Sequence, residues 1–415
     1  MDRCIIRRLI LITPLLAIFV GCLERNLPTA TPIQSGQTTA SVFPTNTPIS
    51  TTTFLPIFPG TAIGQISTRE TGTTPTSTQP EIAQILDMQF IDSAHGWLLA
   101  ATYNGNWGIA IRQTADGGQT WTSVAAPQAQ PAFGMESSTR NADQVHNIRF
   151  VDEKTGWIYG QGLYYTQDGG NIWHPVDFTG AVVALEPEGT DQATWAIIQT
   201  CPQIPDCTAQ LYQAAPDEPD LWTLISTLPI QHPLLAFNRA DPETAYLLSN
   251  AGSQDFRVNL VTTQDAGHSW AIRETPCFSE QPLLANTDTS NLYMVCSGIP
   301  SAGNQPKQFY TSTDGGEAWR LVEYSNNETA LPTFGYADAL VFLSNKVGVV
   351  GLGRSTLVTT QDGGLSWTMS SIPNMADSGG WVLVIAGGRD IFAALQTTVF
   401  NSSDGGKTWQ STEIH

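Results

Sequence analysis

An eight-residue phrase recurs along the chain: a small hydroxyl residue, any residue, Asp, two residues that are Gly in nearly every copy, two variable residues and Trp. We call it the DGG turn. Its clear copies are Thr114–Trp121, Thr166–Trp173, Thr263–Trp270, Ser312–Trp319, Thr360–Trp367 and Ser402–Trp409. The steps between successive Asp residues are 52, 97, 49, 48 and 42 residues. The long step spans two ordinary steps and predicts a seventh copy, which remains as Asp217 and Trp222.

A second phrase, Phe-x-Asp-x-x-x-Gly-Trp, precedes the first two DGG turns at Phe90–Trp97 and Phe150–Trp157 and decays in later units. The apolar runs of each unit are short and rich in β-branched and aromatic residues, which is typical of strands. A strand-rich period of about 40–50 residues is typical of a propeller blade. The sequence therefore predicts an all-β fold over residues 83–415, a seven-bladed β-propeller of four-stranded antiparallel blades.

Elementary physics assigns structural roles to the conspicuous residues of the DGG turn. Glycine adopts positive φ at little cost, and an Asp carboxylate accepts nearby backbone N–H groups. A Trp buried between blades removes a large apolar area from water. The alternative is catalysis or metal binding by these turns. The residues assigned to the scaffold are Asp116, Trp121, Asp168, Trp173, Asp217, Trp222, Asp265, Trp270, Asp314, Trp319, Asp362, Trp367, Asp404 and Trp409.

The DGG turn resembles the Asp box, or BNR repeat, of sialidase-type propellers. The Phe-x-Asp-x-x-x-Gly-Trp phrase and the count of seven units more closely resemble the propellers of photosystem II assembly and stability factors. The resemblance covers residues 86–415 and implies the fold. It implies less about function, because the matching residues are scaffold.

The N-terminus has the layout of a secretory signal peptide over residues 1–21. Arg3, Arg7 and Arg8 precede an apolar run from Leu9 to Val20, which is too short to span a membrane comfortably. The end of the run, FVGC, resembles the lipobox of bacterial lipoproteins. That resemblance implies a lipid on Cys22 and a protein anchored to the bacterial cell membrane, facing its extracytoplasmic side. The alternative is an ordinary secreted protein with a stray Cys in its signal.

Residues 22–82 are predicted to form a disordered linker. Of residues 23–80, 29 are Thr, Ser or Pro and four are charged. Such a composition cannot bury enough apolar surface to fold.

Four cysteines remain in the propeller region, and they allow three pairings. Cys201–Cys207 and Cys277–Cys296 would both be local bridges, and we favour them in an oxidising compartment. A zinc site is the alternative, but the sequence has no Cys-x-x-Cys spacing. We expect no metal and no cofactor.

The chain carries a formal net charge of −19 and only four Lys residues. Nucleic acid and anionic headgroups are therefore poor partners. The expected contact with the membrane is the lipid on Cys22, and a monomer is expected.

The sequence lacks the motifs that would mark an enzyme. It has no Arg-Ile-Pro motif of the kind that begins the sialidase arginine cluster, no Gly-x-Ser-x-Gly, and no phosphate-binding loop. Its six histidines show no metal-ligand spacing. We therefore predict that the chain is not an enzyme.

The order of the strands separates two kinds of connection. Writing the strands of each blade as A to D, the A–B and C–D turns share one face, and the B–C and D–A connections share the other. We call these the turn face and the loop face. Long loops on a rigid scaffold concentrate function, so the candidate binding residues are on the loop face: Phe133, Arg140, Tyr336, Arg354 and Trp381. The predicted function is binding of a protein partner, as in assembly of a membrane complex; the alternatives are a carbohydrate-binding module and a sialidase-type glycoside hydrolase.

Overall fold

The computed structural model describes residues 81–132, 143–187, 189, 192–203, 206–252, 255–324, 330–353, 355–372, 381–386 and 390–415. These residues belong to one compact unit, Thr74–His415. The predicted signal peptide and Cys22 lie outside the described residues, as does the predicted linker up to residue 80.

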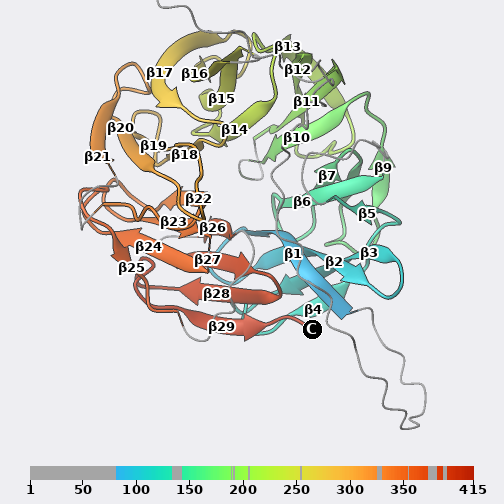
Figure 1. Ribbon diagram of the computed structural model, residues 1–415. Coiled ribbons are helices and arrows are strands. Elements are labelled where there is room, and N and C mark those ends of the chain that lie inside the picture. The colour runs from blue at the N-terminus through green and yellow to red at the C-terminus, as the bar shows by residue number, and fades with distance from the viewer. Residues whose placement is uncertain are drawn as a thin grey trace, which may run out of the picture. The chain divides into compact units, whose positions relative to one another are not determined.

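Seven sheets follow one another in chain order and are arranged in a ring (Figure 1). Blade 1 contains β1 (Glu81–Phe90), β2 (Gly96–Tyr103), β3 (Trp107–Thr114) and β4 (Thr122–Val124). Blade 2 contains β6 (Gln144–Phe150), β7 (Gly156–Gly160), β8 (Leu163–Thr166) and β9 (His174–Val176). Blade 3 contains β10 (Ala181–Glu186), β11 (Thr194–Gln203), β12 (Asp206–Ala214) and β13 (Trp222–Thr227). Blade 4 contains β14 (Leu234–Arg239), β15 (Ala245–Gly252), β16 (Asp255–Thr263) and β17 (Ala271–Phe278).

Blade 5 contains β18 (Leu283–Asn286), β19 (Leu292–Ser297), β20 (Lys307–Ser312) and β21 (Arg320–Tyr324). Blade 6 contains β22 (Ala337–Phe342), β23 (Gly348–Leu352), β24 (Thr356–Thr360) and β25 (Thr368–Met369). Blade 7 contains β26 (Val382–Ala386), β27 (Asp390–Leu395), β28 (Thr398–Ser402) and β29 (Gln410–Glu413). The seven-bladed, four-stranded antiparallel architecture predicted from the repeat is confirmed. One addition is β5 (Gln130–Pro131), which pairs in parallel with β6.

The second strand of each blade lies inside its sheet, and in blades 1 and 2 it is largely apolar. In β2 every residue before Tyr103 is buried, and β7 is buried throughout. The fourth strands are short or exposed, as β4 and β25 show. A strand covered on both faces reads as a continuous apolar run, so the burial order follows from the position of each strand between its neighbours.

The Phe-x-Asp-x-x-x-Gly-Trp phrase joins neighbouring blades. Phe150 of blade 2 stacks on Trp97 of blade 1, with ring centroids 3.9 Å apart. The Gly is needed because the Phe of the same phrase lies over it: a Cβ built at Gly156 would come within 2.5 Å of the Phe150 ring. The Asp closes the A–B turn, since Asp152 Oδ1 accepts the N–H groups of Lys154 and Thr155 at 2.8 and 2.6 Å.

Among the described strands, the ring closes between blades 7 and 1 without exchange of a strand, because each sheet takes its four main strands from one continuous stretch of the chain. Phe90 stacks on Phe392 with centroids 3.5 Å apart. Ile85 N–H donates to the Gln396 carbonyl at 2.6 Å. Closure therefore depends on side-chain packing and a few hydrogen bonds. In the part of the chain that the structure describes, no helix is long and apolar enough to cross a membrane.

Candidate functional site

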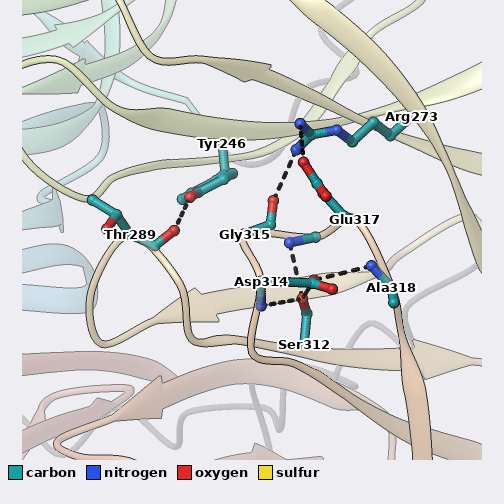
Figure 2. Close-up of polar contacts among 9 residues, drawn as sticks. Tyr246, Arg273, Thr289, Ser312, Asp314, Gly315, Glu317 and Ala318 are labelled. Carbon is teal, nitrogen blue, oxygen red and sulfur yellow. Dashed lines mark hydrogen bonds and ion pairs between the residues drawn. The ribbon is translucent and has the colours of Figure 1, made fainter.

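The DGG turns satisfy their own polar groups. In blade 5, Ser312 Oγ donates to Asp314 Oδ1 at 2.7 Å, and Ala318 N–H donates to the same oxygen at 3.0 Å (Figure 2). Ser312 Oγ in turn accepts Gly316 N–H at 2.9 Å. The Ala318 N–H bond, followed by the Ser312 bond, lowers the pKa of Asp314. A carboxylate held this way is committed to the turn.

Each described DGG turn after the first has a neighbour in the preceding blade. Arg273 of β17 donates from Nη1 to the Gly315 carbonyl at 3.0 Å and pairs with Glu317 at 3.3 Å (Figure 2). In blade 4, the Gly267 carbonyl accepts Ser226 Oγ of blade 3 at 2.6 Å. The turns therefore link blades as well as strands.

The degenerate copy of the DGG turn, in blade 3, keeps the packing of its Trp but closes its turn differently. Trp222 packs edge-to-face on Trp157, with centroids 6.2 Å apart. Asp217 is exposed, and its turn is closed by backbone hydrogen bonds, including Glu218 N–H to the Ala215 carbonyl at 3.1 Å. The Trp has kept its packing position, whereas backbone bonds close the turn around Asp217.

Titratable groups of blades 1 to 3 meet on the first strand of each blade and, for Tyr159, on the second strand of blade 2. Arg149 Nη1 lies 2.6 Å from Asp87 Oδ2, which also accepts Ile148 N–H at 3.0 Å. Burial raises the pKa of Tyr159 and the pKa of Glu186. Burial therefore disfavours the ionised form of both side chains. The visible effect of this cluster is to tie blade 1 to blade 2 through Arg149 and Asp87.

The candidate binding residues predicted on the loop face differ in their exposure to solvent. Tyr336 is 40% exposed. Trp381 is 5% exposed, donates from Nε1 to the Leu352 carbonyl at 2.9 Å and packs edge-to-face on Phe400. Its assignment to an exposed binding face was wrong, because an indole with a backbone acceptor between two blades is core. Phe133, Arg140 and Arg354 lie outside the described residues.

A buried lysine that the sequence analysis missed organises the loop before Tyr336. Lys307 is 0% exposed, and its ammonium donates to the carbonyls of Gln305 and Gly335 at 2.9 Å and of Pro332 at 3.0 Å. Burial lowers the pKa of Lys307 to about 8. A buried cation requires such partners. No motif surrounds Lys307, so only the folded loop reveals this role.

Well-exposed aromatic side chains of the described residues gather on the loop face. They are Tyr103, Trp107, Phe256, Phe278 and Tyr336, each at or next to a B–C or D–A connection. Ile299, which is 87% exposed, also lies on the loop face, in the β19–β20 connection. The other large apolar side chains exposed among the described residues are not aromatic: Ile172, Leu221, Leu224, Ile272, Leu321, Leu365 and Met369. Aromatic rings offer large contact areas with few rotatable bonds, so the loop face is the better binding surface.

Blade 4 carries a groove at its outer edge. The register between β16 and β17 shifts between Arg257 and Asn259. Opposite Val258, β17 bulges outward, and Thr275 Oγ1 donates to the Val258 carbonyl at 2.6 Å. A cavity of about 260 Å³ opens here, lined by Ala251, Arg257, Val258, Asn259, Ile272, Glu274 and Thr275. Bulges redirect side chains and often lie beside functional sites.

Two disulfides hold the loop face. Cys277, within the bulged strand β17, is bonded to Cys296 of β19, so the bulge is tethered to blade 5. Cys201 and Cys207 close the β11–β12 hairpin. The disulfides favoured from their local spacing are confirmed. Among the residues described, no group of three or more His, Cys, Asp or Glu side chains is placed to hold a metal ion.

No family model matches the chain, and no curated protein matches it. Among solved structures, YCF48 bound to a D1 peptide is similar over 81% of this chain and 95% of its own, with 18% identity and a TM-score of 0.54. YCF48 from Cyanidioschyzon merolae is similar over 81% of this chain and 97% of its own, with 14% identity and a TM-score of 0.52. An ancestral GH74 enzyme is similar over 80% of this chain and 46% of its own, with 12% identity and a TM-score of 0.57. Identities this low show a shared fold alone.

The comparison corrects one prediction. The lack of familiar catalytic motifs predicts that the chain is not an enzyme. The GH74 enzyme shares the propeller fold, so neither the fold nor those missing motifs exclude catalysis. The prediction of no enzymatic activity is withdrawn.

Proposed function

We propose that this chain is a bacterial surface lipoprotein whose propeller binds a polypeptide segment on the loop face, at the bulged edge of blade 4. In this proposal residues 1–21 are the signal peptide, Cys22 carries the lipid, and the linker over residues 22–82 separates the propeller from the membrane. Assembly of a membrane protein complex, predicted from the resemblance, is the role in which such binding would serve.

The main observation behind this proposal is the groove beside β17. Phe256 and Phe278, at the loop-face ends of β16 and β17, are 51% and 62% exposed. Ile272, which lines the groove, is 51% exposed. A groove with exposed apolar residues along it and at its end suits the alternating side chains of an extended peptide.

Two further observations support a polypeptide over other partners. Arg257 and Glu274 line the same groove, so the groove carries side chains of both charges. The similar structure of YCF48 was solved with a D1 peptide bound, which demonstrates peptide binding by a propeller of this fold.

The test is site-specific photo-crosslinking in native membranes. A benzophenone amino acid replaces Phe278 in one full-length protein and Leu365, an exposed aliphatic residue of the turn face (54%), in a matched control. We expect one dominant protein adduct at position 278 and little at position 365. A Phe256→Ser change should then remove that adduct.

Equal adducts at both positions, or none at position 278, would contradict the proposal. Mapping the crosslinked partner peptide by mass spectrometry would identify the segment that occupies the groove.

A further inference from the structure

The B–C hairpin of blade 1 presents two aromatic rings to solvent. Tyr103 ends β2 and Trp107 begins β3; they are 52% and 45% exposed. Their ring centroids are 5.0 Å apart and the ring planes are tilted by 54°. They are directly opposite each other in the antiparallel register, so the strand pairing itself holds the two rings together.

The hairpin tip projects beyond the outer strand of its blade. The fourth strand, β4, pairs with Ile111, Arg112 and Gln113 and does not reach the tip. A Cβ built at Gly105 meets nothing within 4 Å, so the space around the turn is open. A flat ligand can therefore approach the rings without displacing a neighbouring strand.

The residues of the hairpin itself are uncharged. Residues 102–110 read TYNGNWGIA and include no Asp, Glu, Lys or Arg, in a chain whose net charge is −19. Asn104 and Asn106 stand between the two aromatic residues and are exposed. Each amide offers both a donor and an acceptor. Exposed rings with neighbouring amides match a ligand that has C–H faces and many hydroxyl groups but no charge.

We propose that the Tyr103–Trp107 hairpin is a binding site for a neutral polysaccharide. Trp107 and Tyr103 pack against the C–H faces of sugar rings, and the amides of Asn104 and Asn106 exchange hydrogen bonds with hydroxyl groups. The site belongs to blade 1 and is separate from the blade 4 groove, so it does not depend on the proposed polypeptide partner.

The tip differs from the groove in the features that select a ligand. The groove has aliphatic and charged lining, including Ile272, Arg257 and Glu274, whereas the tip has aromatic and amide groups. An anionic lipid surface is disfavoured, because Glu81 is directly opposite Tyr103 in the β1–β2 register. Acidic polysaccharides are disfavoured for the same reason.

The test is affinity electrophoresis of the full-length protein in mild detergent, with calorimetry for any polymer that retards it. The probes are hydroxyethyl cellulose, laminarin and soluble starch as neutral polymers, and alginate as an acidic one. We expect retardation by at least one neutral polymer and none by alginate. Trp107→Ala should weaken that binding on the order of tenfold, and Trp107→Phe should restore part of it.

Phe278→Ala is the matched control, since it removes an exposed aromatic of the same face. It should leave sugar binding unchanged, while Trp107→Ala should leave both the thermal midpoint and the crosslink at position 278 unchanged. The proposal is overturned if no neutral polymer retards the protein, if Trp107→Ala leaves the retardation undiminished, or if alginate retards the protein equally well. If no protein adduct forms at position 278 but neutral polymers still retard the protein, the proposed function is refuted and the sugar-binding site stands.

Discussion

On the turn face, Asp265 accepts the N–H of Ser269 at 2.9 Å and its hydroxyl at 2.6 Å, all within one turn. On the loop face, Lys307 reaches the carbonyls of Pro332 and Gly335, 25 and 28 residues further along the chain. The bonds inside each DGG turn are thus local and repeat from blade to blade, whereas the bonds of Lys307 to Pro332 and Gly335 join distant residues and do not repeat. The difference teaches that the most repeated residues are the most committed to structure, which leaves binding to the unrepeated ones.

The largest expected difference between the two faces is in the free energy of unfolding lost when a glycine with positive φ is replaced. Gly364 of the turn face has φ +88°, and a Cβ there would come within 2.0 Å of the Phe309 ring. Gly105 of the loop face has φ +99° with nothing within 4 Å. Gly364→Ala should lower the free energy of unfolding by about 3 kcal/mol or more, and Gly105→Ala by about 1 kcal/mol. Chemical denaturation checks both; similar losses would mean that the two faces tolerate change equally.

A smaller effect is expected from the disulfides of the loop face. Cys277–Cys296 closes 19 residues and Cys201–Cys207 closes 6. Replacing both cysteines of a pair by Ala should lower the free energy of unfolding by about 3 kcal/mol for the first and about 2 kcal/mol for the second. Because Cys277 tethers the bulge of β17, only the first change should also weaken the crosslink at position 278. Intact crosslinking without that bond would show that the bulge holds its shape alone.

The two faces also differ in how the pKa of a carboxyl group is shifted. Hydrogen bonds from the Ser269 hydroxyl and N–H lower the pKa of Asp265 from 3.8 to about 2. Its stabilising contribution is therefore complete above about pH 4 and is lost as the pH falls through 2. Burial raises the pKa of Asp338, on the loop face, from 3.8 to about 7, so its contribution is complete below about pH 4 and is lost as the pH rises through 7.

The measurement is the thermal midpoint against pH for each Asp→Asn variant. Asp265→Asn should reduce the loss of stability on acidification. Asp338→Asn should raise the thermal midpoint at about pH 8, where Asp338 is ionised and its buried charge is lost on substitution. It should leave the midpoint unchanged at about pH 4, where Asp338 is already protonated. The same pH response in both variants would refute the contrast between the faces.

Much of the fold could be predicted from the sequence, because the repeated phrases report bonds between residues that are close in the chain. Asp116 accepts Thr120 N–H at 2.9 Å, four residues away, and this geometry recurs wherever the phrase recurs. The spacing of such turns sets the number of blades. The candidate site could be predicted only as a face: Tyr336 is exposed there, but Trp381 is buried.

The sequence by itself determined the class of fold, the number of blades and the place of each DGG turn, since these depend on local backbone conformation and a regular spacing. Only the tertiary structure decided which loop-face residues are exposed and where a groove opens. The bulge opposite Val258 depends on the register of β16 against β17, and the position of Lys307 depends on a loop folded over it. Such features arise from contacts between distant segments, and a pattern that repeats once per blade does not encode them.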